Sequence, residues 1–295
     1  KIRTEGMETG KEICGGEKIM RVGCTIDYFK GANLVDSFRQ LKEMGMNSCQ
    51  LVCWDRSVLD AEHAAEVKQI CEDEGIEISA VWCGWEGPRF WNFYEGQDTL
   101  GLVPEAYRFK RIEMLAQGSD FAKELGVTDL VTHAGYMPEN PHDPKYPEII
   151  TALKYLARKC KQNGQYFLFE TGQETPVTLL RVMQDIGFDN VGINLDPANL
   201  IMYGKANPVD SLDVFGKYVR GVHGKDGLYP TDGRELGDEV ALGEGKVNFP
   251  VFLKKLHELG YDGDITIERE ITGEQQKKDI QMAKKMLDEI ISGLE

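Results

Sequence analysis

The stretch Val219–Gly227, V-R-G-V-H-G-K-D-G, reads as a short apolar strand that ends at His223. Three carboxylates end strand-like runs in the same way: Glu170 in Q-Y-F-L-F-E, Asp196 in V-G-I-N-L-D and Glu268 in D-I-T-I-E. Glycine, proline or polar loop residues follow each run. In a barrel of parallel strands, inward-facing residues at the carboxyl ends of the strands meet at one mouth. The four side chains are therefore expected to converge.

Eight such strand candidates lie along the chain: Met20–Cys24, Cys49–Cys53, Glu77–Trp82, Asp129–His133, Tyr166–Glu170, Val191–Asp196, Val219–His223 and Asp264–Glu268. Between them, apolar residues recur every 3 to 4 positions, as in amphipathic helices. Glycine lies just past a helical run at positions 45, 75, 126, 164, 187 and 260, where it accepts the left-handed conformation that ends a helix. The repeat predicts an α/β fold, a single-domain (β/α)8 TIM barrel, rather than an open doubly wound sheet. We assign residues 19–295 to this catalytic barrel and residues 1–18 to an N-terminal extension without a predicted role.

Composition excludes several classes of partner. The chain has 34 basic and 49 acidic residues, a net charge of -15, and no basic patch, which argues against nucleic acid. Seven scattered cysteines, an odd number without zinc-knuckle spacing, indicate small buried reduced thiols. No apolar run is long enough for a signal peptide or a membrane span. A cytoplasmic protein without a membrane partner is therefore expected.

Alternation along the strands gives a test of the expected convergence, because successive residues face opposite sides. In the last strand, two isoleucines share the face that suits a helix layer, so Glu268 points inward. In the strands that end at Asp196 and His223, apolar residues likewise lie on the face opposite the terminal polar residue. The face of Glu170 is not settled, because a tyrosine and a leucine share it.

A single carboxylate at a strand end is commonly a helix cap or a solvated loop residue, and a single histidine is commonly packed in a core. Four convergent side chains are harder to explain in this way, because clustered carboxylates repel one another unless a cation or proton intervenes. Three carboxylates and an imidazole suit one hard or borderline divalent ion, with Mn²⁺ preferred and Mg²⁺, Co²⁺ or Zn²⁺ as alternatives. The predicted ligands are Glu170, Asp196, His223 and Glu268.

Other polar residues are expected near these ligands. His133 ends the fourth strand with inward parity, so it could orient a ligand, contact substrate or simply be packed. Lys225 could donate to a substrate oxygen, and Asp226 could hold an imidazole N–H, with loop solvation as the alternative for both. The residues expected to contact substrate or to support the ligands also include Gln173, Asn199, Trp54 and Trp82.

Two loops that follow strands are longer than usual and would overhang the mouth, at residues 84–103 and 224–245. The first carries the aromatic residues Trp85, Phe90, Trp91, Phe93 and Tyr94. It could be a lid that stacks on a sugar, or a contact within a homo-oligomer, either a dimer or a tetramer.

Six sequence words resemble the xylose-isomerase-like superfamily of TIM barrels, also known as the sugar phosphate isomerase/epimerase family. In the family's order, from about residue 19 onward, they are T-H-A-G-Y-M-P-E-N-P (132–141), F-E-T-G-Q-E-T-P (169–176), L-D-P-A-N-L (195–200), V-H-G-K-D-G (222–227), L-G-E-G-K-V-N-F (242–249) and G-Y-D-G-D-I-T-I-E-R-E (260–270). The resemblance implies a metal on the four ligands named above. In the keto-sugar 3-epimerases of the superfamily the two glutamates also act as acid and base, which makes Glu170 and Glu268 the predicted catalytic residues. Those epimerases have His three residues after the metal Asp, whereas this chain has Asn199.

The expected reaction is proton abstraction next to a carbonyl through a metal-stabilised enediolate. Returning the proton gives an epimerase or an isomerase of a keto-sugar or polyol. Loss of a β-leaving group gives a lyase or dehydratase on a keto-inositol or 3-keto-glycoside. The absence of a glycine-rich phosphate cradle favours a non-phosphorylated carbohydrate. The DNA-binding apurinic endonuclease branch is disfavoured by five histidines and the charge of -15, and a non-catalytic sugar-binding barrel remains an alternative.

Overall fold

The computed structural model describes residues 20–294, so the expected extension, residues 1–18, lies outside the described residues. All eight predicted strands form, and they close into one parallel barrel in the order β1-β10-β7-β6-β5-β4-β3-β2. The single-domain (β/α)8 TIM barrel is confirmed. The barrel strands are β1 (Arg21–Tyr28), β2 (Ser48–Cys53), β3 (Glu77–Cys83), β4 (Asp129–Thr132), β5 (Tyr166–Glu170), β6 (Val191–Leu195), β7 (Val219–Gly224) and β10 (Asp264–Ile267).

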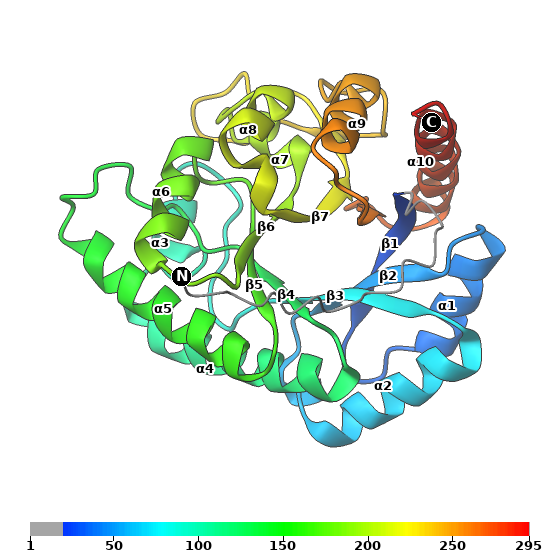
Figure 1. Cartoon of the computed structure of the whole chain (residues 1–295), viewed down its shortest axis with the longest axis horizontal. Helices are drawn as coiled ribbons and strands as arrows, with labels where there is room; N and C mark the ends of the chain where they lie inside the picture. The colour runs from blue at the N-terminus through cyan, green and yellow to red at the C-terminus, as the bar shows by residue number, and fades with distance from the viewer. Residues whose placement is uncertain (1–19, 295) are drawn as a thin grey trace, which may run out of the picture.

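Helices surround these strands (Figure 1). They are α1 (Leu34–Glu43), α2 (Ala61–Glu74), α3 (Gly96–Thr99), α4 (Glu105–Leu125), α5 (Lys145–Gln162), α6 (Pro176–Ile186), α7 (Pro197–Met202), α8 (Pro208–Phe215), α9 (Phe249–Glu258) and α10 (Glu274–Ser292). A short hairpin of β8 (Asp226–Gly227) and β9 (Glu239–Val240) lies in the loop after β7. The six glycines expected to end helices all have positive φ, between 66° and 80°.

The alternation of residues along each strand separates two apolar layers. Ile265 and Ile267 pack in the large cluster between the strands and the helices, as predicted from the last strand. A smaller cluster fills the barrel interior and includes Trp82, Val131 and Leu168. Because Leu168 lies inside the barrel, the face it shares with Glu170 is the inward face. The orientation that the sequence left open is therefore inward.

Two buried amides divide the barrel interior along its axis. Gln50 on β2 donates from Nε2 to Oδ1 of Asn194 on β6, at 3.2 Å. A cavity of about 530 Å³ lies on the amino-terminal side of this pair, and both amides line it. A second cavity, of about 320 Å³, lies at the carboxyl ends of the strands. Only the second is lined by the expected ligands Glu170 and Glu268.

The first and last strands are joined by side chains as well as by the sheet. Arg21 on β1 donates from Nε to Asp264 on β10, at 2.8 Å, and from Nη1 to Glu77 on β3, at 2.6 Å. Ser48 on β2 also donates to Asp264. This group of side chains holds the seam of the barrel at its amino-terminal end.

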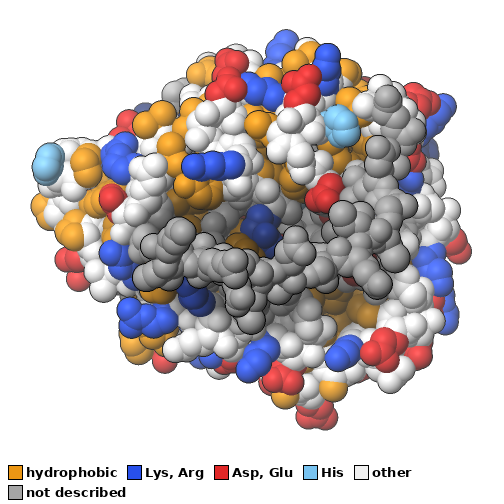
Figure 2. Space-filling view, viewed as in Figure 1, with side chains coloured by type: hydrophobic (Ala, Val, Ile, Leu, Met, Phe, Trp, Pro, Cys, Tyr) orange, Lys and Arg blue, Asp and Glu red, His pale blue; other side chains and the backbone are white. Residues whose placement is uncertain are grey.

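Cysteines 24, 49, 53, 83 and 160 are buried and unpaired, and Cys71 is half-buried. Burial raises the pKa of the Cys24 and Cys83 thiols to about 12, so both are packing residues and not reactive thiolates. Among the helices of residues 20–294, none is both long and apolar enough to cross a bilayer. Basic and acidic side chains are interspersed over the described part of the face seen in Figure 2.

Candidate metal centre and active site

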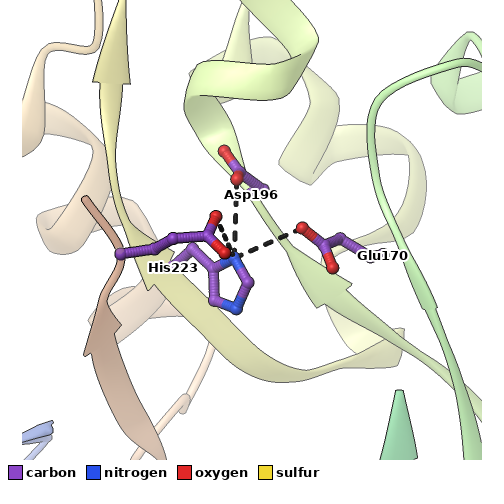
Figure 3. A group of neighbouring side chains, drawn as sticks. Glu170, Asp196 and His223 are labelled. Atoms are coloured by element: carbon purple, nitrogen blue, oxygen red, sulfur yellow. Dashed lines mark hydrogen bonds and ion pairs between the residues drawn. The ribbon is translucent and has the colours of Figure 1, made fainter. Parts of the chain in front are cut away.

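The four predicted ligands converge at the carboxyl ends of adjacent strands. Glu170 ends β5, Asp196 follows β6, His223 lies in β7 and Glu268 follows β10. One donor atom from each lies within 4.8 Å of all the others. In Figure 3, Glu170 and Asp196 point toward the ring of His223 from separate elements. Convergence, which the sequence predicted from strand ends alone, is observed.

His223 is the centre of this cluster and is fully buried. Its Nδ1 lies 3.4 Å from Glu170 Oε1, 3.4 Å from Asp196 Oδ2 and 3.3 Å from Glu268 Oε2. On the other edge of the ring, Nε2 lies 2.8 Å from Gln50 Oε1 and 3.0 Å from Asn194 Nδ2. A proton on Nε2 donated to this oxygen leaves the Nδ1 lone pair directed at the carboxylates, the tautomer that a metal ligand requires.

The cluster favours positive charge at its centre. Burial opposes protonation of His223, but the carboxylates of Glu268 and Glu170 raise its pKa well above the ordinary value. A proton on the imidazole therefore balances part of the negative charge when no metal is bound. A divalent ion would supply that charge more fully, and three carboxylate oxygens with one imidazole nitrogen form a donor set that suits it. The four residues thus suggest a divalent metal site without identifying the metal.

Asp196 has two functions, because each of its oxygens has a different partner. Oδ1 accepts the backbone N–H of Asn199, at 2.9 Å, and so caps helix α7. Oδ2 faces His223. The helix-cap interpretation and the ligand interpretation of this carboxylate are therefore compatible.

Glu170 is held by side chains from three directions. Trp82 donates its indole N–H to Oε2, while Asn199 Nδ2 lies 3.4 Å and His133 Nε2 3.5 Å from Oε1. Burial would raise the pKa of Glu170, but His133 and His223 hold it below its ordinary value. Asn199 stands where the 3-epimerases have histidine, and its amide also donates to the carbonyl of Thr171, at 3.2 Å. Three of the residues predicted to support the ligands thus contact one glutamate.

Glu268 has a different environment. The buried ammonium of Lys225 lies 2.9 Å from its Oε2, 3.1 Å from Glu270 Oε1 and 3.7 Å from Asp196 Oδ2. Burial would raise the pKa of Glu268, but Lys225 and His223 hold it well below its ordinary value. Lys225 therefore keeps this glutamate ionised, and donation by Lys225 to a substrate oxygen stays a prediction.

The prediction that Asp226 holds an imidazole N–H is wrong. Its two oxygens accept backbone N–H groups of the same loop, from Gly227, Gly243, Gly245 and Val247. Asp226 thus organises the loop after β7. Gln50 and Asn194 contact Nε2 of His223 instead, at 2.8 and 3.0 Å. The signal for Gln50 was present in the sequence, since it alternates with the outward-facing residues of β2.

Aromatic residues form the wall of the cavity that faces the ligands. Trp54, Trp82 and Trp91 line it, with ring centroids of Trp54 and Trp82 4.9 Å apart. Trp85 packs behind them, 5.3 Å from Trp54. The chain has four tryptophans, and all of them belong to this group. Gln173 does not line the cavity but donates to the hydroxyl of Tyr203, at 3.0 Å, which does.

The two long loops meet over the mouth, since the backbone N–H of Phe93 donates to the carbonyl of Arg234, at 2.8 Å. The first loop is held from below by Arg111, which is fully buried. Its guanidinium donates to the backbone carbonyls of Glu86, Pro88, Thr99 and Gly101. Phe90 and Tyr94 remain 52% and 72% exposed, so an oligomer contact stays a prediction. Sequence reasoning missed Arg111, because it is a charged residue on the buried face of α4, where an apolar residue is expected.

A sequence model of the xylose isomerase-like TIM barrel family matches residues 38–289. The chain belongs to this family. The solved structure of a xylose isomerase domain protein from Planctomyces limnophilus is 32% identical, with a TM-score of 0.88, over 94% of this chain and 99% of that one. An uncharacterised protein of Methanocaldococcus jannaschii is 25% identical over 261 residues, 84% of this chain and 83% of its own length.

More distantly similar proteins differ in their names. The inosose dehydratase of Lacticaseibacillus casei is 24% identical over 153 residues, 45% of this chain and 50% of its own length. A D-tagatose 3-epimerase-like protein shares the fold at 22% identity and a TM-score of 0.71, over 93% and 98% of the two chains. A xylose isomerase-like TIM barrel protein from Mycobacterium smegmatis in complex with magnesium also shares the fold. Its sequence identity is 17% and its TM-score 0.70, over 93% of this chain and 97% of that one.

Proposed function

We propose that this member of the xylose isomerase-like family is a metal-dependent isomerase or epimerase of a keto-sugar or related polyol. One observation carries the proposal: two glutamates from separate strands, Glu170 and Glu268, approach the same imidazole nitrogen at 3.4 and 3.3 Å. Such an arrangement can hold one cation and also provide two carboxylates that flank a bound substrate. The named activities of epimerases in this family support the same class of reaction.

The proposed chemistry is removal of a proton from the carbon next to a carbonyl. A divalent ion held by Glu170, Asp196, His223 and Glu268 would withdraw charge from the substrate oxygens and make that proton more acidic. One glutamate takes the proton as base. For epimerisation the other glutamate must first gain a proton from solvent, which it then donates to the opposite face; for isomerisation the first glutamate donates the proton it took to the neighbouring carbon. Lys225 keeps Glu268 ionised, whereas Trp82 fixes one oxygen of Glu170 and leaves the other directed toward the cluster. Both glutamates are ionised in the apo site, and Glu268, whose pKa is lowered further, is the weaker base of the two.

A second candidate reaction is dehydration. The similarity to an inosose dehydratase over about half of each chain favours it. The first step is the same proton abstraction. The two reactions then diverge at the common intermediate. Dehydration expels a hydroxyl β to the carbonyl, whereas epimerisation reprotonates the carbon.

The test is proton exchange followed by NMR in D₂O, with a panel of ketoses, inososes and 3-keto-glycosides. The reaction is run with Mn²⁺, with Mg²⁺ and after chelation. Deuterium incorporation next to a carbonyl that depends on the metal is the expected result, and the product separates epimerase, isomerase and dehydratase. No exchange with any member of the panel, while metal binding is measured calorimetrically, would favour a non-catalytic sugar-binding barrel.

A further inference from the structure

The charged groups that line the mouth are paired, with one exception. Lys225 contacts Glu268, Glu270 and Asp196. Arg89 also lines the cavity. Among residues 20–294, its side chain packs on an aromatic ring and has no acidic partner. Arg89 is therefore a cation at the mouth whose hydrogen-bonding capacity is not used by the protein.

Arg89 is an exposed residue whose side chain stacks on Trp54. Its guanidinium carbon lies 4.2 Å from the ring centroid of Trp54. A guanidinium that stacks on an aromatic face keeps its N–H donors free in its own plane, where they match a carboxylate or phosphate group. The backbone on its N-terminal side is held by Arg111, which donates to the carbonyl of Pro88 at 2.9 Å. The side chain is thus presented by an ordered loop.

Arg89 and the ligand cluster lie on different sides of one cavity of about 320 Å³. The cluster occupies the ends of β5, β6, β7 and β10, whereas Arg89 follows β3 and packs on the residue after β2. A substrate whose carbonyl end lies at the cluster would therefore present another substituent to Arg89. The chain carries a net charge of -15, so an anionic substrate needs a local cation to enter such a site.

We propose that Arg89 binds an anionic substituent, a carboxylate or a phosphate, and that the substrate is an anionic keto-sugar or keto-polyol. This inference rests on the proposed function, because it assigns the carbonyl end of the substrate to the metal-ligand cluster. It adds a phosphorylated sugar to the non-phosphorylated carbohydrate that the missing glycine-rich cradle favours. A guanidinium recognises a phosphate without such a cradle.

The tryptophans provide a binding readout that is independent of turnover. Because all four belong to the aromatic wall, their emission reports on this cavity alone. The metal-loaded protein is titrated with D-fructose, D-fructuronate and D-fructose 6-phosphate, a matched neutral, carboxylate and phosphate set. At least one anion is expected to bind about tenfold or more tightly than fructose, the effect of a charge-assisted hydrogen bond. Which anion binds more tightly distinguishes the carboxylate from the phosphate.

The variant Arg89→Gln is expected to reduce the ratio of anion to fructose affinity by about tenfold or more, whereas Arg89→Lys retains part of the preference. The control is Arg56→Gln, since Arg56 is a half-buried arginine that pairs with Glu86 of the same loop but does not line the cavity. The inference is overturned if fructose binds as tightly as both anions or if neither anion binds at millimolar concentration. It is also overturned if Arg89→Gln and the control Arg56→Gln change the ratio of anion to fructose affinity equally.

Proton exchange in D₂O on the same samples separates this inference from the proposed function. Metal-dependent proton exchange without any preference for an anion would support the proposed reaction and contradict the anion-binding role of Arg89. An anion preference that depends on Arg89, without proton exchange in any probe, would support the anion-binding role of Arg89 and contradict the proposed reaction.

Discussion

The two sides of the mouth are built in different ways. On one side, four ligand-type residues lie at or just beyond strand ends, and the hydrogen-bonded barrel sets their positions. On the other side, stacked tryptophans and a loop held by one buried arginine form the wall. The first side depends on backbone pairing that all members of the fold share. The second depends on side chains of the 84–103 loop together with Trp82 of β3 and Trp54 after β2, so we expect chemistry to reside on the first and substrate choice on the second.

The largest effect is expected from the ligand side. Replacing Glu170 or Glu268 by glutamine removes a carboxylate that would both bind the metal and transfer the proton. Proton exchange should fall by ~1000-fold or more, measured by NMR in D₂O with saturating metal. Glu270→Gln is the matched control, since Glu270 also contacts Lys225 but is not in the ligand cluster, and it should lose less than about tenfold. Exchange that survives in both Glu170→Gln and Glu268→Gln would contradict the assignment of chemistry to this side.

The next effect separates the two sides. Arg111→Met removes the donors to four buried or half-buried carbonyls of the 84–103 loop. The free energy of unfolding should fall by ~3 kcal/mol, measured by urea denaturation, while metal affinity changes little. Arg39→Met, which breaks an exposed pair with Glu74, should cost ~0.5 kcal/mol. A parallel loss of metal binding in Arg111→Met would show that the two sides are not independent.

A smaller effect is expected from the support of His223. Gln50→Leu removes the oxygen that lies 2.8 Å from Nε2 and leaves only the amide nitrogen of Asn194 beside it, so the tautomer with a proton on Nε2 loses its acceptor. Metal affinity should fall by ~10 to 100-fold, measured by calorimetry. Gln173→Leu is the control from the aromatic side, because this buried amide contacts Tyr203 and not the ligands. Equal metal affinities for Gln50→Leu and Gln173→Leu would rule out the role of Gln50.

The smallest effect concerns Glu174, only four residues from Glu170. It is buried, and within the described part of the chain neither of its oxygens has a hydrogen-bond partner. Burial raises its pKa to about 8. Because the native state holds this proton more tightly than the unfolded state, stability is full below the unfolded pKa and falls as pH rises toward 8.

Glu174→Gln should remove this dependence and make the protein ~2 kcal/mol more stable at pH 8, measured by urea denaturation between pH 5 and 8. Glu139→Gln, a change at an exposed site, serves as the control. An unchanged pH slope in Glu174→Gln would show that water or another group compensates the charge of Glu174.

The ligand side could be predicted from the sequence for a physical reason. Strand alternation and the glycines that end helices locate strand ends, and in a parallel barrel all those ends meet. The same logic would have found Gln50, which shares the inward face of β2. It could not find Arg111, because a charged residue on the buried face of α4 departs from the apolar pattern, or Arg89, because a loop carries no periodic signal. Asp226 was misassigned for the same reason, since its partners are loop backbone groups up to 21 residues away.

The seam at Arg21 has a consequence for the order of folding. Its hydrogen bond to Asp264 joins residues 243 positions apart, so nearly the whole chain must be synthesised before β1 can acquire its second neighbour. Until β10 arrives, β1 is an edge strand, open to pairing with another nascent chain. Closure of this longest loop also has a high entropic cost. The charged contacts at the seam would thus act late, and a chaperone that shields β1 during synthesis should increase the yield of folded barrel.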